Sequence, residues 1–175
     1  YHRILENGGG PILALGSKAD PESDGQPDFN ALGDDHDVFW QNNPTQDDED
    51  GVTWTTLSPG QFAYFDVTVT GEGYVSGWID FNGDGAWADY TDAAGNVISE
   101  KIIDGEHFNS ETRSFRVYVP ASVDPMATFA RFRLSSDENA VLLPTGPVPF
   151  NPTQAPDGEV EDYQIQIQVG DAKIS

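Results

Sequence analysis

Apolar and polar residues alternate along several stretches of this chain, and the alternation predicts β-strands. A period of two puts every second side chain on the same face of a strand. Six stretches are predicted as strands: 52–57, 61–70, 73–80, 112–119, 127–136 and 162–169. No long stretch shows the 3.6-residue period of a helix. Strands separated by turns rich in Gly, Pro and Asp predict an all-β fold, namely an antiparallel β-sandwich with jelly-roll or immunoglobulin-like topology.

The alternation also predicts which side chains face the core. The inward positions of four strands are mostly apolar: Ala63, Phe65, Val67, Val69, Phe115, Val117, Val119, Thr128, Ala130, Phe132, Leu134, Tyr163, Ile165, Ile167 and Val169. Trp78 is predicted to join them. Arg131 and Arg133 share the opposite face of their strand. We expect them to pair with the chain's own acids, Glu161 or Asp162, because guanidinium groups suit bidentate pairing with carboxylates.

Three segments show no strand pattern. Residues 19–51 hold eleven acidic residues and no Lys or Arg, and bound cations would help such a segment fold onto the sheets. Residues 89–111 are predicted as a hairpin or long loop that turns at 94–96. Residues 143–156 contain five prolines, which excludes a central strand. We see no domain boundary, and we expect residues 1–175 to form a single domain cut from a larger extracellular protein.

The charge balance limits the partners of this chain. The 30 acidic and 8 basic residues give a net charge of −22. Nucleic acids and anionic membrane surfaces are unfavourable partners, because phosphate recognition needs clustered Lys or Arg. No apolar run reaches the ~18 residues of a membrane helix, so we expect no membrane insertion. Self-repulsion destabilises so acidic a fold, and bound divalent cations would relieve it. The absence of cysteine excludes disulfides and thiol catalysis.

The stretch 80–85 has the spacing of a calcium-binding loop. Asp80, Asn82 and Asp84 place side-chain oxygens at positions 1, 3 and 5, and a Gly at position 6 permits a sharp turn. Ca²⁺ takes six to eight oxygens at roughly 2.3–2.6 Å, so alternate residues of a tight loop can converge on one ion. The alternative interpretation is an Asn-, Asp- and Gly-rich turn that only reverses the chain.

The second half of this loop departs from the EF-hand pattern. Position 12 is Thr91, where an EF-hand has a bidentate Glu. The nearest carboxylates are Asp89, at position 10, and Asp92. Either Asp89 closes the site locally, or a carboxylate from a distant segment does. In the second case the ion would link two parts of the fold.

The sequence shows no residue pattern typical of catalysis or of a transition-metal site. His2, His36 and His107 are widely spaced and match no zinc motif. No order of Ser, His and Asp suggests nucleophilic catalysis. No apolar niche is evident for the raised pKa that a glycosidase acid requires. We therefore do not expect an enzyme.

Five motifs follow one another along the chain. They are Leu-Gly followed by Asp, Glu and Asp-Gly-Gln-Pro within 15–27, Asp-Asp-Glu-Asp-Gly-Val at 47–52, Gly-Trp-Ile-Asp-Phe-Asn-Gly-Asp-Gly at 77–85, Ala-Arg-Phe-Arg-Leu-Ser-Ser at 130–136 and Gly-Glu-Val-Glu-Asp at 158–162. The last is the signature of the GEVED domain family. With the other four in order, the chain resembles that family over residues 15–169. The segment 90–99 is longer than the short acidic turn usual in the family.

The resemblance implies a secreted bacterial β-sandwich module that is not catalytic and is associated with calcium. It carries presumed ligand roles to Asp80, Asn82, Asp84 and Asp89. It also carries acidic-site roles to Glu22, Asp24, Asp48, Asp50, Glu159, Glu161 and Asp162. Calcium ions (Ca²⁺) are thus the expected cofactor, held by long acidic loops.

Two functions follow as expectations. The first is a monomeric calcium-binding module for adhesion or spacing, secreted or on the bacterial cell surface, with a polysaccharide or another cell-surface protein as partner. The alternative is a carbohydrate-binding module attached to a secreted polysaccharide-degrading enzyme. Its sugar platform would be Phe39 and Trp40, or 143–156, because exposed rings can stack on sugar faces. Trp87 follows the calcium loop and would cover the ion or contact a ligand.

Overall fold

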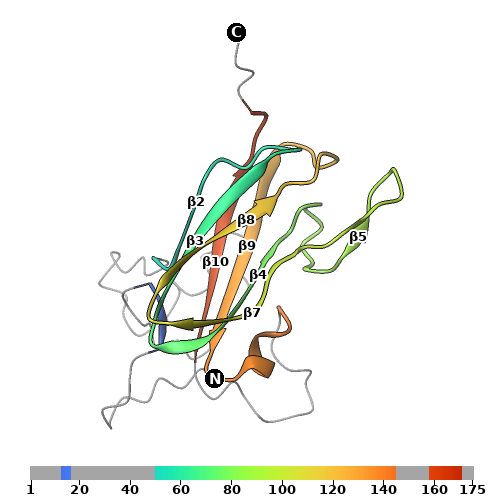
Figure 1. Cartoon of the computed structure of the whole chain (residues 1–175). Helices are drawn as coiled ribbons and strands as arrows, with labels where there is room; N and C mark the ends of the chain where they lie inside the picture. The colour runs from blue at the N-terminus through green and yellow to red at the C-terminus, as the bar shows by residue number, and fades with distance from the viewer. Residues whose placement is uncertain (1–12, 17–49, 145–157, 171–175) are drawn as a thin grey trace, which may run out of the picture.

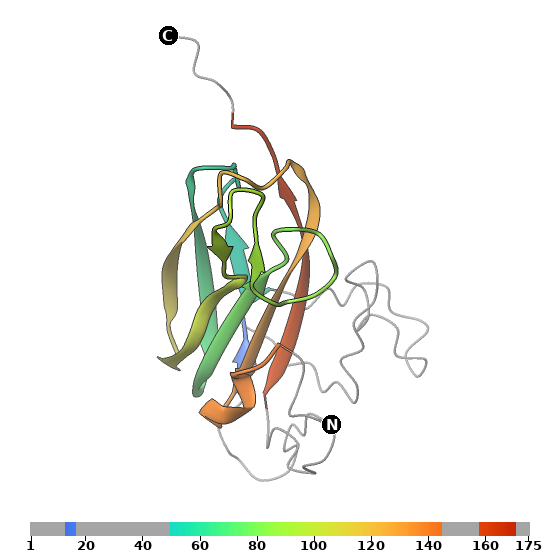
Figure 2. The ribbon, with the colours of Figure 1, turned by 90° about the vertical axis from the view of Figure 1, so that its right-hand side faces the viewer.

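The computed structural model describes residues 13–16, 50–144 and 158–170, and strands dominate its regular structure. Two four-stranded sheets lie face to face (Figure 1, Figure 2). The first sheet contains β1 (Ala14–Leu15), β2 (Val52–Trp54), β3 (Phe62–Thr70) and β8 (Thr112–Tyr118). The second has the order β10 (Glu159–Ile167), β9 (Met126–Ser135), β4 (Glu72–Ile79) and β7 (Lys101–Asn109). All neighbours in both sheets are antiparallel, which confirms the all-β prediction.

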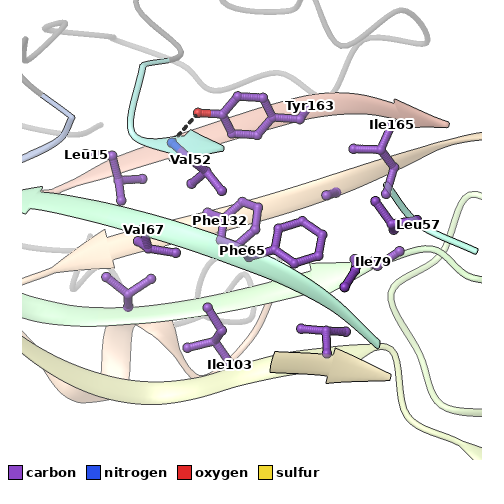
Figure 3. Close-up of a cluster of buried hydrophobic side chains, with 14 of the residues drawn as sticks. Leu15, Val52, Leu57, Phe65, Val67, Ile79, Ile103, Phe132, Tyr163 and Ile165 are labelled. Carbon is purple, nitrogen blue, oxygen red and sulfur yellow. Dashed lines mark hydrogen bonds between the residues drawn. The ribbon is translucent and has the colours of Figure 1, made fainter. Parts of the chain in front are cut away.

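One hydrophobic core fills the space between the two sheets. Phe65 of β3 and Phe132 of β9 meet across it with ring centroids 6.1 Å apart, and Tyr163 of β10 approaches Phe132 edge-on at 6.0 Å (Figure 3). The predicted inward positions are buried or half-buried, with one exception. Val169 is 76% exposed, so its prediction is wrong. Strand β10 has already ended at Ile167, and Val169 lies beyond the sheet.

The outer face of the second sheet is also largely buried. Trp78 is buried there, outside the shared core, beside its cross-strand partner Arg131. The backbone after η1 (Glu138–Val141), a short 3₁₀ helix, returns over this face. Its carbonyl oxygens at Leu143 and Pro144 accept hydrogen bonds from Arg133 and Arg131 at 2.6 and 3.2 Å. Trp78 is therefore buried as expected, on the face of the sheet opposite the core that the two sheets share.

Strand β7 was not among the predicted strands. Its buried residues Ile103 and Phe108 are five positions apart, which is inconsistent with a regular period of two. A β-bulge explains the spacing: Ile103 pairs with Gly77 and Glu106 with Val75, so β7 has one residue more than β4 there. Gly105 takes up the bend with φ of +60°. The inserted residue shifts the inward face and hides the strand pattern.

A hairpin projects from the second sheet between β4 and β7. It is formed by β5 (Tyr90–Thr91) and β6 (Val97–Ile98) and extends away from both sheets (Figure 1). Asp92 holds the turn, since its Oδ1 accepts hydrogen bonds from the backbone N–H groups of Ala94 and Asn96, both at 2.9 Å. The predicted hairpin with a turn at 94–96 is thus confirmed. None of the helices within the described ranges is long and apolar enough to cross a membrane.

Candidate functional site

The loop at 80–85 leaves the end of β4 and begins with a buried aspartate. Asp80 is fixed through its backbone: its N–H donates to the Phe129 carbonyl at 3.0 Å, and its carbonyl accepts from Thr128 Oγ1 at 2.5 Å. These bonds tie the loop to β9, the neighbour of β4 in the sheet. The first residue of the motif therefore has a position set by the sheet.

The Asp80 carboxylate organises the rest of the loop. Oδ1 accepts from the N–H of Gly83 at 2.7 Å and of Asp84 at 3.2 Å, and Oδ2 accepts from the N–H of Gly85 at 2.9 Å. The chain must coil tightly to bring these three donors together. Gly83 and Gly85 adopt φ of +69° and +78°, which residues with a Cβ rarely adopt. The two glycines thus allow the tight coil that brings the three N–H groups to the Asp80 carboxylate.

The other two oxygen-bearing side chains of the motif lie at the surface. Asn82 Oδ1 accepts from the Asp84 N–H, and Asn82 Nδ2 donates to Asp84 Oδ2, both at 2.9 Å. Asp84 Oδ1 accepts from the Ala86 N–H at 2.8 Å. Hydrogen bonds exposed to water contribute about 1 kcal/mol each, so these side chains can reorient at small cost.

A fourth acid, Glu100, lies against this loop and was not predicted from the sequence. It directly precedes β7, and its carbonyl accepts from the Ile79 N–H at 2.9 Å. Its side chain has 0% exposure, and Oε1 accepts from the Phe81 N–H at 3.0 Å. Oε2 is buried and has no hydrogen-bond partner in the part of the chain that the structure describes. The loop and the start of β7 are therefore joined through this carboxyl group.

The surroundings of Glu100 favour its neutral form. Burial, followed by the negative charge of Asp80, raises the pKa of Glu100 to about 7, with a smaller contribution from Asp84. Backbone N–H groups of Phe81 and Asn82 offset part of this shift. Tyr90 of the hairpin is affected too, since burial and then Glu100 raise the pKa of its hydroxyl. The acids at the base of the hairpin thus lie near enough to oppose one another's ionisation.

Asp89 and Trp87, singled out from the sequence, lie beside the loop. The exposed Asp89 accepts a hydrogen bond from Ser99 Oγ at 2.8 Å, which joins the two sides of the hairpin. The Trp87 ring lies 5.4 Å from the Arg131 guanidinium, a distance suited to a cation–π contact. Neither contact is to the Asp80 carboxylate.

The loop region fits a hard cation in its donor types. It offers carboxylate and amide oxygens, and it includes a buried carboxylate oxygen without a partner among the described residues. Within 13–16, 50–144 and 158–170, no three His, Cys, Asp or Glu side chains are grouped closely enough to hold a metal ion as they stand. Binding at this loop would therefore require the exposed side chains to turn.

Two further acids, Glu159 and Glu161, are buried on the core-facing side of β10. Glu159 Oε2 accepts from the Leu15 N–H at 2.6 Å, and Glu161 Oε1 accepts from the Gly51 N–H at 3.3 Å. Tyr163 donates to Glu161 Oε2 at 2.7 Å and accepts from the Val52 N–H at 3.0 Å (Figure 3). The acids of the signature motif thus hold two chain segments that are remote in sequence.

Close packing surrounds these two acids. A Cβ on Gly51 would lie 2.6 Å from Leu15 Cβ and 2.7 Å from Glu161 Oε2. A Cβ on Gly16 would lie 1.7 Å from Asp50 Oδ1. Asp50 therefore lies near the two glutamates, in a region separate from the loop at 80–85.

Asp162 lies on the opposite face of β10 from its two neighbours. It binds Arg131 in bidentate geometry, with Nε–Oδ1 at 2.7 Å and Nη2–Oδ2 at 2.5 Å. The predicted pairing of Arg131 with Asp162 is confirmed, whereas Glu161 faces the core and is not its partner. The other predicted site residues fall outside the described ranges: Glu22, Asp24, Asp48, Phe39 and Trp40.

A row of exposed aromatic rings covers part of the outer face of the first sheet. Phe62, Tyr64 and Tyr118 are each about half exposed. Phe62 and Tyr118 are cross-strand partners with ring centroids 5.3 Å apart, and Arg116 lies 4.5 Å from the centroid of Phe62. The signal was present in the sequence, because these rings occupy the outward positions of 61–70 and 112–119.

Comparison with known protein families gives a match over the region that contains the site. A family model described as GEVED domain matches residues 74–166, which is more than half of the chain and includes the loop at 80–85, Glu100 and the acids of β10. No curated protein matches the chain.

Proposed function

The chain belongs to the GEVED domain family, and from this premise we propose that it is a non-catalytic, calcium-binding β-sandwich module of a bacterial extracellular protein, acting in adhesion or spacing. The observation that carries the proposal is the loop at 80–85. Its oxygen donors have the spacing of a calcium loop, and the first of them, Asp80, is fixed to the sheet at a position where further negative charge accumulates.

The chemistry of calcium suits this loop. Ca²⁺ prefers carboxylate and amide oxygens, and it would draw the half-buried Asn82 and the exposed Asp84 side chains inward to join Asp80. The energy required is small, because the bond between Asn82 Nδ2 and Asp84 Oδ2 is exposed. Neutralising the loop would also reduce the repulsion within a chain of net charge −22.

A role outside the cell follows from the affinity expected of such a site. Extracellular modules bind Ca²⁺ with dissociation constants of roughly 10⁻⁴–10⁻³ M, so the module would be loaded only where calcium is plentiful. A rigid, loaded module serves as a spacer between other domains, or presents an adhesive surface. The single domain, monomeric state and surface location expected from the sequence remain part of this proposal.

Calorimetry with CaCl₂ tests the calcium site. Wild type is expected to bind Ca²⁺, and Asp84→Asn is expected to bind more weakly. Asp66→Asn is the matched control, because Asp66 is an exposed acid on β3, in the other sheet. Equal stoichiometry and affinity in all three proteins would refute a site at this loop.

Carbohydrate binding is the second candidate, and the row of Phe62, Tyr64 and Tyr118 favours it. Aromatic rings on a flat sheet face can stack on pyranose rings, and Arg116 can donate hydrogen bonds to sugar hydroxyls. A glycan array with and without Ca²⁺ tests this function. Binding that is lost in Tyr118→Ala would support a carbohydrate-binding module, and uniform lack of binding would favour the spacer.

A further inference from the structure

We propose that Glu100 supplies the closing ligand of the calcium loop, so that one ion binds both ends of the hairpin segment 86–99. This inference rests on the proposed calcium function and extends it to a residue twenty positions from the start of the loop. It resolves the open question of which acid replaces the missing ligand at position 12. The ion would be a cross-link between the end of β4 and the start of β7.

The first support is the state of the Glu100 side chain. Leaving a polar atom buried without a hydrogen-bond partner costs about 1–3 kcal/mol, and more for a charged group. Oε2 is such an atom within the described part of the chain, while Oε1 is held by the Phe81 N–H inside the loop. A cation beside Oε2 would supply the missing partner without moving the fixed oxygen.

The second support is the placement of Glu100 relative to the other donors. The negative charges of Asp80 and Asp84 both act on Glu100, although the three carboxyl groups are not grouped closely enough to hold an ion as they stand. Asp80 directly follows β4 and Glu100 directly precedes β7, and backbone bonds to Phe129 and Ile79 fix their positions. These two acids have fixed backbones beside the loop, and the exposed Asp84 would turn toward them to complete the set. Asp89 accepts a hydrogen bond from Ser99 instead.

The consequence concerns the hairpin. Residues 86–99 leave the loop and return at Glu100, and the hairpin projects from the sheets (Figure 1). An ion held by Asp80 and Glu100 would fix both strands of the hairpin where they join the sheet. Calcium would then determine the orientation of this projection as well as the stability of the fold.

The test combines calorimetry with hydrogen exchange on the whole chain. Glu100→Gln removes the charge and keeps the shape, and Glu111→Gln is the matched control, since Glu111 is exposed at the other end of β4, in the turn between β7 and β8. We expect Glu100→Gln to weaken Ca²⁺ binding by about tenfold or more, since ligand charge sets calcium affinity. Calcium should slow exchange in 86–99 in wild type and Glu111→Gln, and not in Glu100→Gln.

The outcomes separate the two proposals. Wild type that binds no Ca²⁺ overturns the calcium function and this inference with it. Wild type and Glu100→Gln that bind equally well overturn the role of Glu100 and leave the calcium function standing. If Glu100→Gln does not fold, Glu100→Asp decides, because its shorter side chain keeps the charge and withdraws the oxygen. Wild-type affinity in Glu100→Asp would refute the inference.

Discussion

Replacing Glu100 by Gln should stabilise the calcium-free protein at neutral pH, although it removes a negatively charged group that we assign to the metal. The pKa of Glu100 rises from 4.5 in the unfolded chain to about 7 in the folded protein. One unit corresponds to 1.36 kcal/mol, so holding Glu100 ionised in the folded state costs about 3 kcal/mol. Glu100→Gln removes this cost, but the buried Gln amide lacks one hydrogen-bond partner, which costs about 1 kcal/mol. The variant is therefore expected to be more stable than wild type by about 2 kcal/mol.

The sign of the pH dependence follows from the direction of the shift. Below pH 4.5 both states hold the proton, and Glu100 costs nothing. Between pH 4.5 and 7 only the folded state retains it, so stability falls as the pH rises. Above about pH 7 Glu100 is ionised in both states, and the folded protein bears the full free-energy cost of its buried charge. The contribution of Glu100 is therefore most favourable in acid and is lost toward neutral pH.

Urea unfolding in EDTA, followed by tryptophan fluorescence at pH 5 and pH 8, measures this effect. Wild type and the control Glu111→Gln should lose about 2.5 kcal/mol more between the two pH values than Glu100→Gln. Excess calcium at pH 8 should reduce the difference between wild type and Glu100→Gln by about 1.4 kcal/mol or more, because tenfold weaker binding lowers the stabilisation of the variant by that amount. Parallel pH profiles in EDTA for wild type and Glu100→Gln would refute the reasoning.

Three further predictions concern calcium and packing. Transferring wild type from Ca²⁺ at ten times its dissociation constant into EDTA removes about 1.4 kcal/mol of stabilisation by bound calcium. The Tm should fall by about 3–6 °C. An unchanged Tm in a verified metal-free sample would contradict the mechanism. Gly51→Ala brings a Cβ to 2.7 Å from Glu161 Oε2 and should cost about 2 kcal/mol in urea unfolding; wild-type stability would show that the site can relax. Phe65→Ala empties the centre of the core and should cost about 3–5 kcal/mol by the same measurement; a loss below 1 kcal/mol would mean that the sheets close over the gap.

The period of two was sufficient to predict most of the fold. It predicted the core faces of β3, β8, β9 and β10, because a regular strand between two layers must alternate. It failed where the backbone is irregular: the bulge at Gly105 shifted the inward face of β7. It also overextended β10 to Val169, since the sequence does not show where pairing with β9 stops.

The candidate site was predictable only in its local part. Asp80, Asn82 and Asp84 are recognisable because their spacing lies within one loop. Glu100 is a single acid between Ser99 and Lys101, with no motif around it. Its relation to Asp80 arises from the pairing of β4 with β7, which depends on the whole sheet. The separation of Asp162 from Glu159 and Glu161, in contrast, follows from alternation alone.

The hydrogen bonds of Glu159 and Glu161 also have a consequence for how the chain can vary. These acids hold Leu15 and Gly51, and Gly16 lies against Asp50, so the described residues on either side of positions 17–49 meet at one point of the framework. A framework of this kind sets the ends of an insert and not its length, since each doubling of a flexible loop costs only about 0.6 kcal/mol. The residues between positions 16 and 50 could therefore be replaced by a segment of another length, while Glu159 and Glu161 continue to hold Leu15 and Gly51 together.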